Sequence, residues 1–416
     1  MKILLKSATI IDNSSPFHNQ TKDILIDNFK IVQIEDHIDL KDVQAVELPN
    51  LHISQGWFDS SVSFGEPGFE ERETISNGLK SAAAGGFTSV VLNANPSSII
   101  SSPAQVDFVK TKAKNHATVL KPLGSISKNG EGQQLAELYD MHQHGAVGFY
   151  DYQSDMDNIE LLKLALQYTC DFNGLVMSFP LDTKLAKSGV MHEGPVSTRL
   201  GMAGMSYTSE VSRIRRDLEL VSYTGGRLHI PTISCAESVN IIRNAKSKGL
   251  KVTCSVAIHN LVLTDEALQE FDTNFKVCPP LRTEIDKRAL IEGLKDGTID
   301  MVTSDHNPLD PESKLMTFDH ALFGTIGLET AFGALQSIFT TAASIDLLTK
   351  GKTIFQIDSN PIDIGVMTDL SLFSPTEKQL VDAKSLQSKS KNSCFLGYEF
   401  NGKAFGIIAN NTQTIF

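Results

Sequence analysis

Cysteine is scarce in this sequence, and long apolar runs are missing. The five cysteines form no Cys-x-x-Cys pair, and they are Cys170, Cys235, Cys254, Cys278 and Cys394. An odd number of widely spaced cysteines favours buried free thiols in a reducing compartment. Because no stretch of about 18 apolar residues occurs, we also expect no membrane span. Together these absences favour a cytoplasmic protein.

An excess of positive charge is also lacking. The formal net charge is −12 and the sequence pI is near 5.4, which argues against nucleic acid or an anionic membrane as the main partner. The sequence has no long repeats and no low-complexity tracts. Its N-terminal apolar run has no cleavage-site pattern, so we expect a β-strand there rather than a signal peptide.

The 416 residues divide into three zones. Residues 1–53 alternate short apolar runs with Asn, Asp and Ser clusters, which is the pattern of a small antiparallel sheet. Residues 54–354 alternate β-rich runs with amphipathic helical stretches, which predicts parallel βα units closing into a barrel. Residues 355–416 return to short strands and turns. We therefore expect an α/β protein: a (β/α)8 TIM barrel with a small β-sandwich domain formed from both chain ends.

Five segments resemble the dihydroorotase family of cyclic amidohydrolases, in the family's order along nearly the whole chain. They are GWFDSSVSFGEPGFEERE from Gly56, MHEGPVSTRLGMAGM from Met191, FKVCPPLRTEIDKRALIEGLKDGTIDMVTSDHNP from Phe275, FGTIGLETAFGAL from Phe323 and SKSKNSCFLGYEFNGKAFGIIANN from Ser388. The resemblance implies an amidohydrolase-type barrel with a β-sandwich. It also implies the family reaction, the reversible ring closure of N-carbamoyl-aspartate to dihydroorotate in pyrimidine synthesis.

Zinc is the cofactor that the resemblance implies. Opening or closing a cyclic amide needs a nucleophilic hydroxide and a polarised carbonyl, and zinc supplies both by lowering the pKa of a bound water to about 7. Histidines and carboxylates are the residues that hold the metal. In a barrel of this kind they stand at the C-terminal ends of the strands, so each predicted strand end can be compared with the family motif.

The first barrel strand has lost both family histidines. The family motif Asp-x-His-x-His corresponds here to the run from Asp59 to Ser63, so serine stands at both histidine positions, Ser61 and Ser63. A serine hydroxyl is a poor zinc ligand at neutral pH. Where the family has a substrate-binding arginine, this chain has Gly65, so no guanidinium is present to grip a carboxylate in a bidentate pair.

Later strand ends carry similar replacements. Asp151 follows the fourth strand, where the family has a bridging carboxylate, either a carboxylated lysine or an aspartate. Ser178 and Thr232 stand where the fifth and sixth strands of the family end on histidine ligands. The altered metal positions are therefore Ser61, Ser63, Asp151, Ser178 and Thr232.

Two polar positions of the motif are kept. Asp305, in the run Ser304–Leu309, matches the aspartate that serves the family as ligand and general base, and Asn93 matches a substrate-binding position. The last histidine of that family run is Leu309 here. Asp151 and Asp305 alone do not make a tight zinc site. Both could instead bond to backbone amides as structural residues, because a buried carboxylate needs partners.

These replacements favour a dihydroorotase-like protein that has lost the family reaction and binds no metal. The resemblance suggests a structural or regulatory role with aspartate transcarbamoylase, and a homo-oligomer. Two alternatives remain. One is an active dihydroorotase or another cyclic-amide hydrolase with an altered metal site, in which Asp305 is the base. The other is a sensor that binds a polar small molecule through Asn93 and the strand-end hydroxyls.

Overall fold

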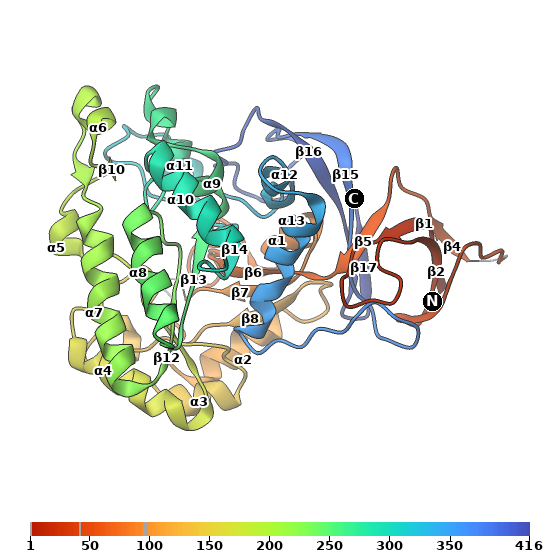
Figure 1. The fold of residues 1–416 in the computed structure, drawn as a ribbon, viewed down its shortest axis with the longest axis horizontal. Coiled ribbons are helices and arrows are strands. Elements are labelled where there is room, and N and C mark those ends of the chain that lie inside the picture. Colours follow the sequence, from red (N-terminus) through yellow and green to blue (C-terminus); the bar gives the residue numbers. More distant parts are fainter. Residues whose placement is uncertain (1, 41–42, 95–98) are drawn as a thin grey trace.

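The two ends of the chain meet in one sheet beside a barrel (Figure 1). The computed structural model describes residues 2–40, 43–94 and 99–416. The eight strands of the sheet run in the order β17-β16-β15-β5-β1-β2-β3, with β4 also paired to β1. They are β1 (Lys2–Ile10), β2 (Thr21–Asp27), β3 (Lys30–Glu35), β4 (Gln44–Val46), β5 (His52–Gln55), β15 (Asp369–Leu380), β16 (Glu399–Ala409) and β17 (Thr412–Ile415).

This sheet is mixed rather than wholly antiparallel. Strands β1, β2 and β3 pair antiparallel, as the alternating pattern of the first zone predicts, but β4 and β5 both pair parallel to β1. Parallel pairing depends on a crossover connection, which local alternation does not reveal. Apolar side chains from β1, β2, β3, β5, β15 and β16 share one core cluster, and this cluster joins the two chain ends.

The barrel strands pair only in parallel. They are β6 (Trp57–Val62), β7 (Phe87–Leu92), β8 (Val119–Pro122), β9 (Leu175–Met177), β12 (Arg227–Ile230), β13 (Val252–Ala257) and β14 (Met301–Thr303). Single bridges complete the ring: Phe149 pairs with Gly124 and Val176, and Val62 pairs with His306. The predicted fourth strand is thus reduced to one bridging residue, and the barrel still closes around it.

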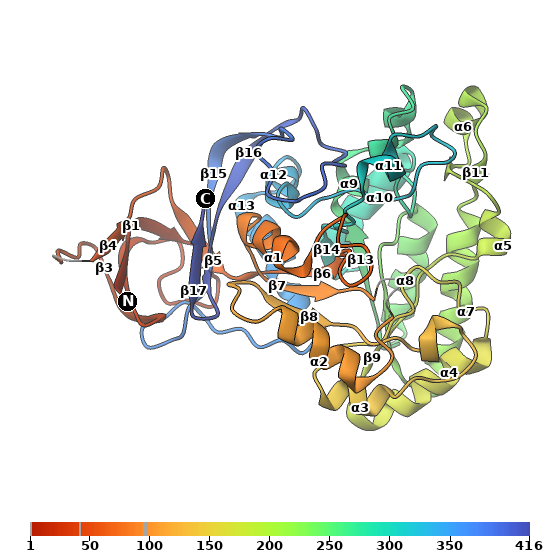
Figure 2. The ribbon, with the colours of Figure 1, turned by 180° about the vertical axis from the view of Figure 1, so that it is seen from behind.

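Helices cover the outside of the barrel in both views (Figures 1 and 2). The outer helices are α1 (Ile75–Ala84), α2 (Pro103–Lys112), α3 (Leu138–Gln143), α4 (Ile159–Tyr168), α7 (Thr208–Thr224), α8 (Ala236–Ser247), α10 (Glu284–Lys295), α12 (Ala331–Gln336) and α13 (Thr341–Thr349). Short elements in the loops are α5 (Thr183–Ala186), β10 (Met191–His192), α6 (Pro195–Leu200), β11 (Gly204–Met205), α9 (Ile258–Val262) and α11 (Pro311–Lys314). In the part of the chain that the structure describes, none of these helices has the length and apolar character needed to cross a membrane.

The inside of the barrel is filled with apolar side chains. One buried cluster contains Phe58, Val91, Leu123, Tyr150, Leu175, Met177, Phe179, Met301 and Phe355. Side chains alternate between the inside and the outside of a barrel strand, and a separate, larger cluster packs between the strands and the helices. The interior is therefore a packed core, which leaves chemistry to the strand ends. The domain limits predicted after residues 53 and 354 stay predictions.

Candidate functional site

The C-terminal ends of the parallel strands bring several predicted site residues to one rim of the barrel. Ser61 lies in β6, Ser63 and Asn93 directly follow β6 and β7, and Asp305 lies two residues after β14. Strands β6 and β7 are neighbours, and β14 is joined to β6 through the Val62–His306 bridge. These four side chains therefore come together, although Asp305 is far from the others in sequence.

Asp305, Ser61, Asn93 and Ser63 form one hydrogen-bonded chain. The Ser61 hydroxyl donates to Oδ1 of Asp305 at 2.9 Å. The Asn93 amide then donates to the hydroxyl oxygens of Ser61 at 2.9 Å and Ser63 at 3.1 Å. Ser61, Asn93 and Asp305 are all buried. The hydroxyls that replace the two family histidines are thus committed to bonds within the protein.

A second carboxylate, Asp59, lies beneath this chain. It accepts the Thr303 hydroxyl and the Ser304 backbone amide, each at 2.6 Å, and the Ser61 backbone amide at 2.8 Å. These bonds tie β6 to β14 at the point where the barrel closes. Burial raises the pKa of Asp59 against the lowering effect of its three donors. Asp59 therefore holds the rim in place from below.

Burial shifts the titration of Asp305 strongly. The pKa of its carboxyl is raised to about 7 by burial and by the negative charge of Asp59, while the Ser61 hydrogen bond lowers it in part. Such a carboxyl is about half protonated at neutral pH. Its backbone has a φ of 48°, in the left-handed region that a non-glycine residue rarely adopts. The turn after β14 thus aims Asp305 at Ser61 despite that conformational cost.

Aromatic and apolar side chains close the mouth around this polar chain. Tyr150, Met177 and Phe179 belong to the interior cluster, and Tyr152 and Cys278 pack against it. The hydroxyl of Tyr152 and Oδ1 of Asn93 are buried and have no hydrogen-bond partner among the described residues. Burial, together with the charge of Asp305, raises the pKa of Cys278 to about 12. The thiol is therefore neutral at physiological pH.

The remaining predicted metal positions face other partners. Oδ1 of Asp151 accepts the Ser125 hydroxyl and the backbone amides of Ile126 and Ser127, and its Oδ2 accepts the Ser127 hydroxyl at 2.5 Å. Both oxygens thus bind the loop after β8. This is the structural arrangement that the sequence left open for Asp151.

Ser178 and Thr232 are also separate from the Asp305 chain. The Ser178 hydroxyl donates to Asp217 of α7 at 2.6 Å, and Asp217 is ion-paired with Arg213 and Arg216. Thr232 has a φ of 50°, and its backbone amide donates to the Ser255 hydroxyl at 3.2 Å. The structure therefore brings four of the seven predicted site residues together and engages the other three elsewhere.

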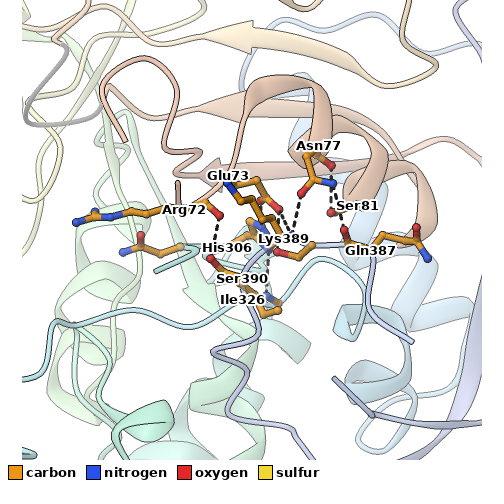
Figure 3. Close-up of polar contacts among 12 residues, drawn as sticks. Arg72, Glu73, Asn77, Ser81, His306, Ile326, Gln387, Lys389 and Ser390 are labelled. Carbon is orange, nitrogen blue, oxygen red and sulfur yellow. Dashed lines mark hydrogen bonds and ion pairs between the residues drawn. The ribbon is translucent and has the colours of Figure 1, made fainter. Parts of the chain in front are cut away.

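A loop from the C-terminal zone packs against the rim next to Asp305; we call residues 387–394 the strap. Figure 3 shows Glu73 and His306 of the barrel facing Lys389 of the strap. The carboxylate of Glu73 bonds to the His306 ring at 2.7 Å, the Ser388 hydroxyl at 2.8 Å and the Lys389 backbone amide at 3.0 Å. Because the Gly327 amide donates to the other ring nitrogen of His306 at 3.3 Å, that nitrogen is an acceptor. His306 is therefore a fully engaged structural residue.

Comparison with known proteins places the chain in a family. A family model described as "Dihydro-orotase-like" matches residues 52–238. A protein named dihydroorotase from Pelotomaculum thermopropionicum is 37% identical over 98% of this chain and 97% of its own length. Another from Geobacter sp. (strain M21) is 37% identical over 97% of each chain. The chain belongs to the dihydroorotase family.

Solved structures support the fold of this dihydroorotase-family chain. The L-hydantoinase (dihydropyrimidinase) from Arthrobacter aurescens superposes with a TM-score of 0.83 at 20% identity, covering 99% of this chain and 96% of that one. A D-hydantoinase gives a TM-score of 0.82 at 19% identity, covering 100% and 95%. The predicted amidohydrolase-type barrel, with a β-domain from both chain ends, is confirmed.

The residues of this dihydroorotase-family site do not fit zinc. Tight zinc sites use histidine, cysteine or carboxylate ligands in a close group. The structure instead brings neutral hydroxyls and one amide to Asp305, while both oxygens of Asp151 bind the loop after β8. Within residues 2–40, 43–94 and 99–416, no three His, Cys, Asp or Glu side chains are grouped so that they could hold a metal ion. No catalytic step through zinc follows from this arrangement.

Two residues that shape the site were missed at the sequence level. Tyr152 places its ring over the mouth, and Glu73 fixes both His306 and the strap. No local pattern marks either residue. The one available signal was burial, because a glutamate directly before the helix start at Thr74 would ordinarily be exposed, yet Glu73 is completely buried. Such a carboxylate needs several donors.

Proposed function

We propose that this chain is a catalytically inactive dihydroorotase-like protein of pyrimidine biosynthesis, with a structural or regulatory role. The observation that carries the proposal is the bonding of the altered positions. Ser61 is bonded to Asp305, and Ser178 is bonded to Asp217. A protein that had only weakened its metal affinity would be expected to keep these positions turned toward a common centre.

The proposed partner is aspartate transcarbamoylase, whose product is the substrate of the family reaction. A barrel that retains the family fold but not its ligands would still offer a surface on which an enzyme assembles. We also propose that the chain forms a homo-oligomer and acts in the cytoplasm. The family relationship supports these statements at the level of fold and ancestry.

Co-purification tests the partnership. The tagged chain, expressed at its natural level and recovered at low ionic strength, should bring aspartate transcarbamoylase with it in a fixed ratio. Deletion of the gene for this chain should change the size of the transcarbamoylase assembly on a gel-filtration column. If the transcarbamoylase elutes identically with and without the chain, and never co-purifies, the proposed partnership is wrong.

An active hydrolase with an altered metal site is the second candidate. The observation in its favour is Asp305, because a carboxyl with a pKa of about 7 is well suited to proton transfer at neutral pH. General acid–base catalysis alone contributes about 10²–10⁴-fold, which is small for amide chemistry without a Lewis acid. Turnover of dihydroorotate, hydantoin or dihydrouracil that disappears in Asp305→Asn would favour this candidate over the inactive protein.

A sensor of small polar molecules is the third candidate. Oδ1 of Asn93 and the hydroxyl of Tyr152 lack partners among the described residues, so each is able to accept or share a hydrogen bond with a ligand. The absence of an arginine at position 65 disfavours a carboxylate ligand. Isothermal titration with dihydroorotate and uracil, compared between the native chain and Asn93→Ala, separates this candidate from the others.

A further inference from the structure

A cavity of about 180 Å³ lies at the end of the barrel opposite the candidate site. Its walls include Lys121, His142, Asn173, Arg227, Phe355 and Gln356. Arg227 is the first residue of β12, and the cavity also borders Leu175, the first residue of β9. The cavity therefore opens at the N-terminal ends of the strands, in the lower part of Figure 1 near the labels of β12 and α3.

Strand alternation turns two cations toward this end of the barrel interior. Leu123 belongs to the interior cluster, and Lys121 lies two residues before it, so both side chains take the same face of β8. In β12 the same relation holds between His229 and Arg227. The ring of His229 lies 5.8 Å from that of Phe355, a member of the interior cluster.

Neither cation has an acidic partner. Lys121 makes no hydrogen bond or ion pair that involves any part of the chain the structure describes. Arg227 donates to the carbonyl oxygens of Asn173 at 2.7 Å and Ile354 at 2.8 Å, which leaves three of its five N–H groups for other acceptors. The cavity has no Asp or Glu among its lining residues.

The surroundings keep these charges uncompensated. Burial and the nearby positive charge of Lys110 lower the pKa of Lys121, and the more distant Asp358 offsets only part of this effect. Burial likewise lowers the pKa of Arg227. In a chain with a net charge of −12, two half-buried cations without a carboxylate beside them are a costly arrangement. An anion in the cavity would remove that cost.

We propose that this cavity binds a phosphate group, either inorganic phosphate or the phosphate of a small metabolite. Lys121 supplies a point charge, and Arg227 supplies planar N–H donors that match phosphate oxygens. Two permanent cations balance the charge of a phosphate dianion, whereas a single carboxylate would leave one unpaired. The site is separate from Asp305 and independent of whether the chain is an enzyme.

Phosphate binding by the full-length protein tests this proposal. Calorimetric titration and thermal unfolding would be measured with inorganic phosphate and pyrophosphate, against sodium chloride at equal ionic strength. We expect one saturable site per chain and a rise in Tm beyond that given by chloride. Lys121→Met should weaken binding at least tenfold, whereas Lys121→Arg should restore most of it. Lys80→Met, an exposed lysine of α1, is the matched control and should bind like the native chain.

Two results would overturn the proposal: phosphate and pyrophosphate that stabilise no more than chloride, or Lys121→Met that binds as tightly as the native chain. Should Lys121→Met fail to fold, acetylation of the native chain gives the same decision. Phosphate should slow the modification of Lys121 several-fold, read by mass spectrometry, while leaving that of Lys80 unchanged. Equal modification of Lys121 with and without phosphate would contradict the site.

Discussion

At the scale of single residues, the replaced positions have acquired new partners. Ser61 joins Asp305 to Asn93, and Ser178 joins β9 to Asp217 of α7. A hydroxyl is small enough to lie against a neighbouring carboxylate where an imidazole would not. Restoring one histidine would therefore break a buried hydrogen bond as well as add a ligand, so the loss of the metal site is built into the local packing.

Asp305 gives a test of this view through the pH dependence of stability. Its carboxyl has an ordinary pKa of 3.8 and a folded pKa of about 7. Between these values the folded chain binds more protons than the unfolded chain, so Asp305 makes the free energy of unfolding fall as the pH rises from about 4 to about 7. A shift of about three units corresponds to about 4 kcal/mol.

Asp305→Asn should remove this contribution. Its side-chain oxygen still accepts from Ser61, so we expect the variant to be more stable than the native chain by about 1–4 kcal/mol at pH 8, with a much smaller difference at pH 4.5. Urea unfolding at the two pH values measures this. If the two proteins show the same pH dependence, Asp305 is not a buried, uncompensated carboxyl.

The sequence predicted which residues reach the rim but not what they contact. The motif positions located Ser61, Asn93 and Asp305 because strand ends of a parallel barrel share one edge. It did not locate the partners of Asp151 or Ser178. Those partners, Ser125, Ser127 and Asp217, come from other strand–helix units, and the contacts depend on how the units pack.

At the scale of elements, regular periodicity was informative and short or irregular segments were not. The amphipathic stretch predicted at 158–168 is α4 (Ile159–Tyr168), which Asn158 caps by accepting the Leu161 amide. The predicted fourth strand pairs only through Phe149. It follows Gly148, which has no side chain to pack against its neighbours. The strap was predicted only as a polar loop, because its bonds go to Glu73, Asn77 and Glu329 in distant segments.

The strap depends on Glu73. Its carboxylate is completely buried and holds His306, Ser388 and the Lys389 amide together. Glu73→Ala would leave these donors unpaired, and we expect it to lower the free energy of unfolding by about 3–5 kcal/mol. It should also speed tryptic cleavage after Lys389 and Lys391. Glu71→Ala, at an exposed neighbouring position, is the control. Equal cleavage rates in both variants would show that the strap is held by other contacts.

At the scale of the whole molecule, the chain keeps the scaffold of its family and changes the contents of the barrel mouth. The sheet from both chain ends, the closed barrel and the strap are all packed. The altered residues gather at the one rim where such barrels carry out chemistry. A protein under selection for its surface and assembly, rather than for turnover, would be expected to keep these features.

Metal content paired with activity tests the central claim most directly. The full-length chain would be purified without chelators, with zinc supplied, and measured by elemental analysis together with carbamoyl-aspartate cyclisation. We expect a folded protein with far less than one zinc per chain and no cyclisation above the uncatalysed rate. One or two zinc ions per chain together with turnover would contradict the account, and would mean that ligands other than Ser61, Ser63, Ser178 and Thr232 hold the metal.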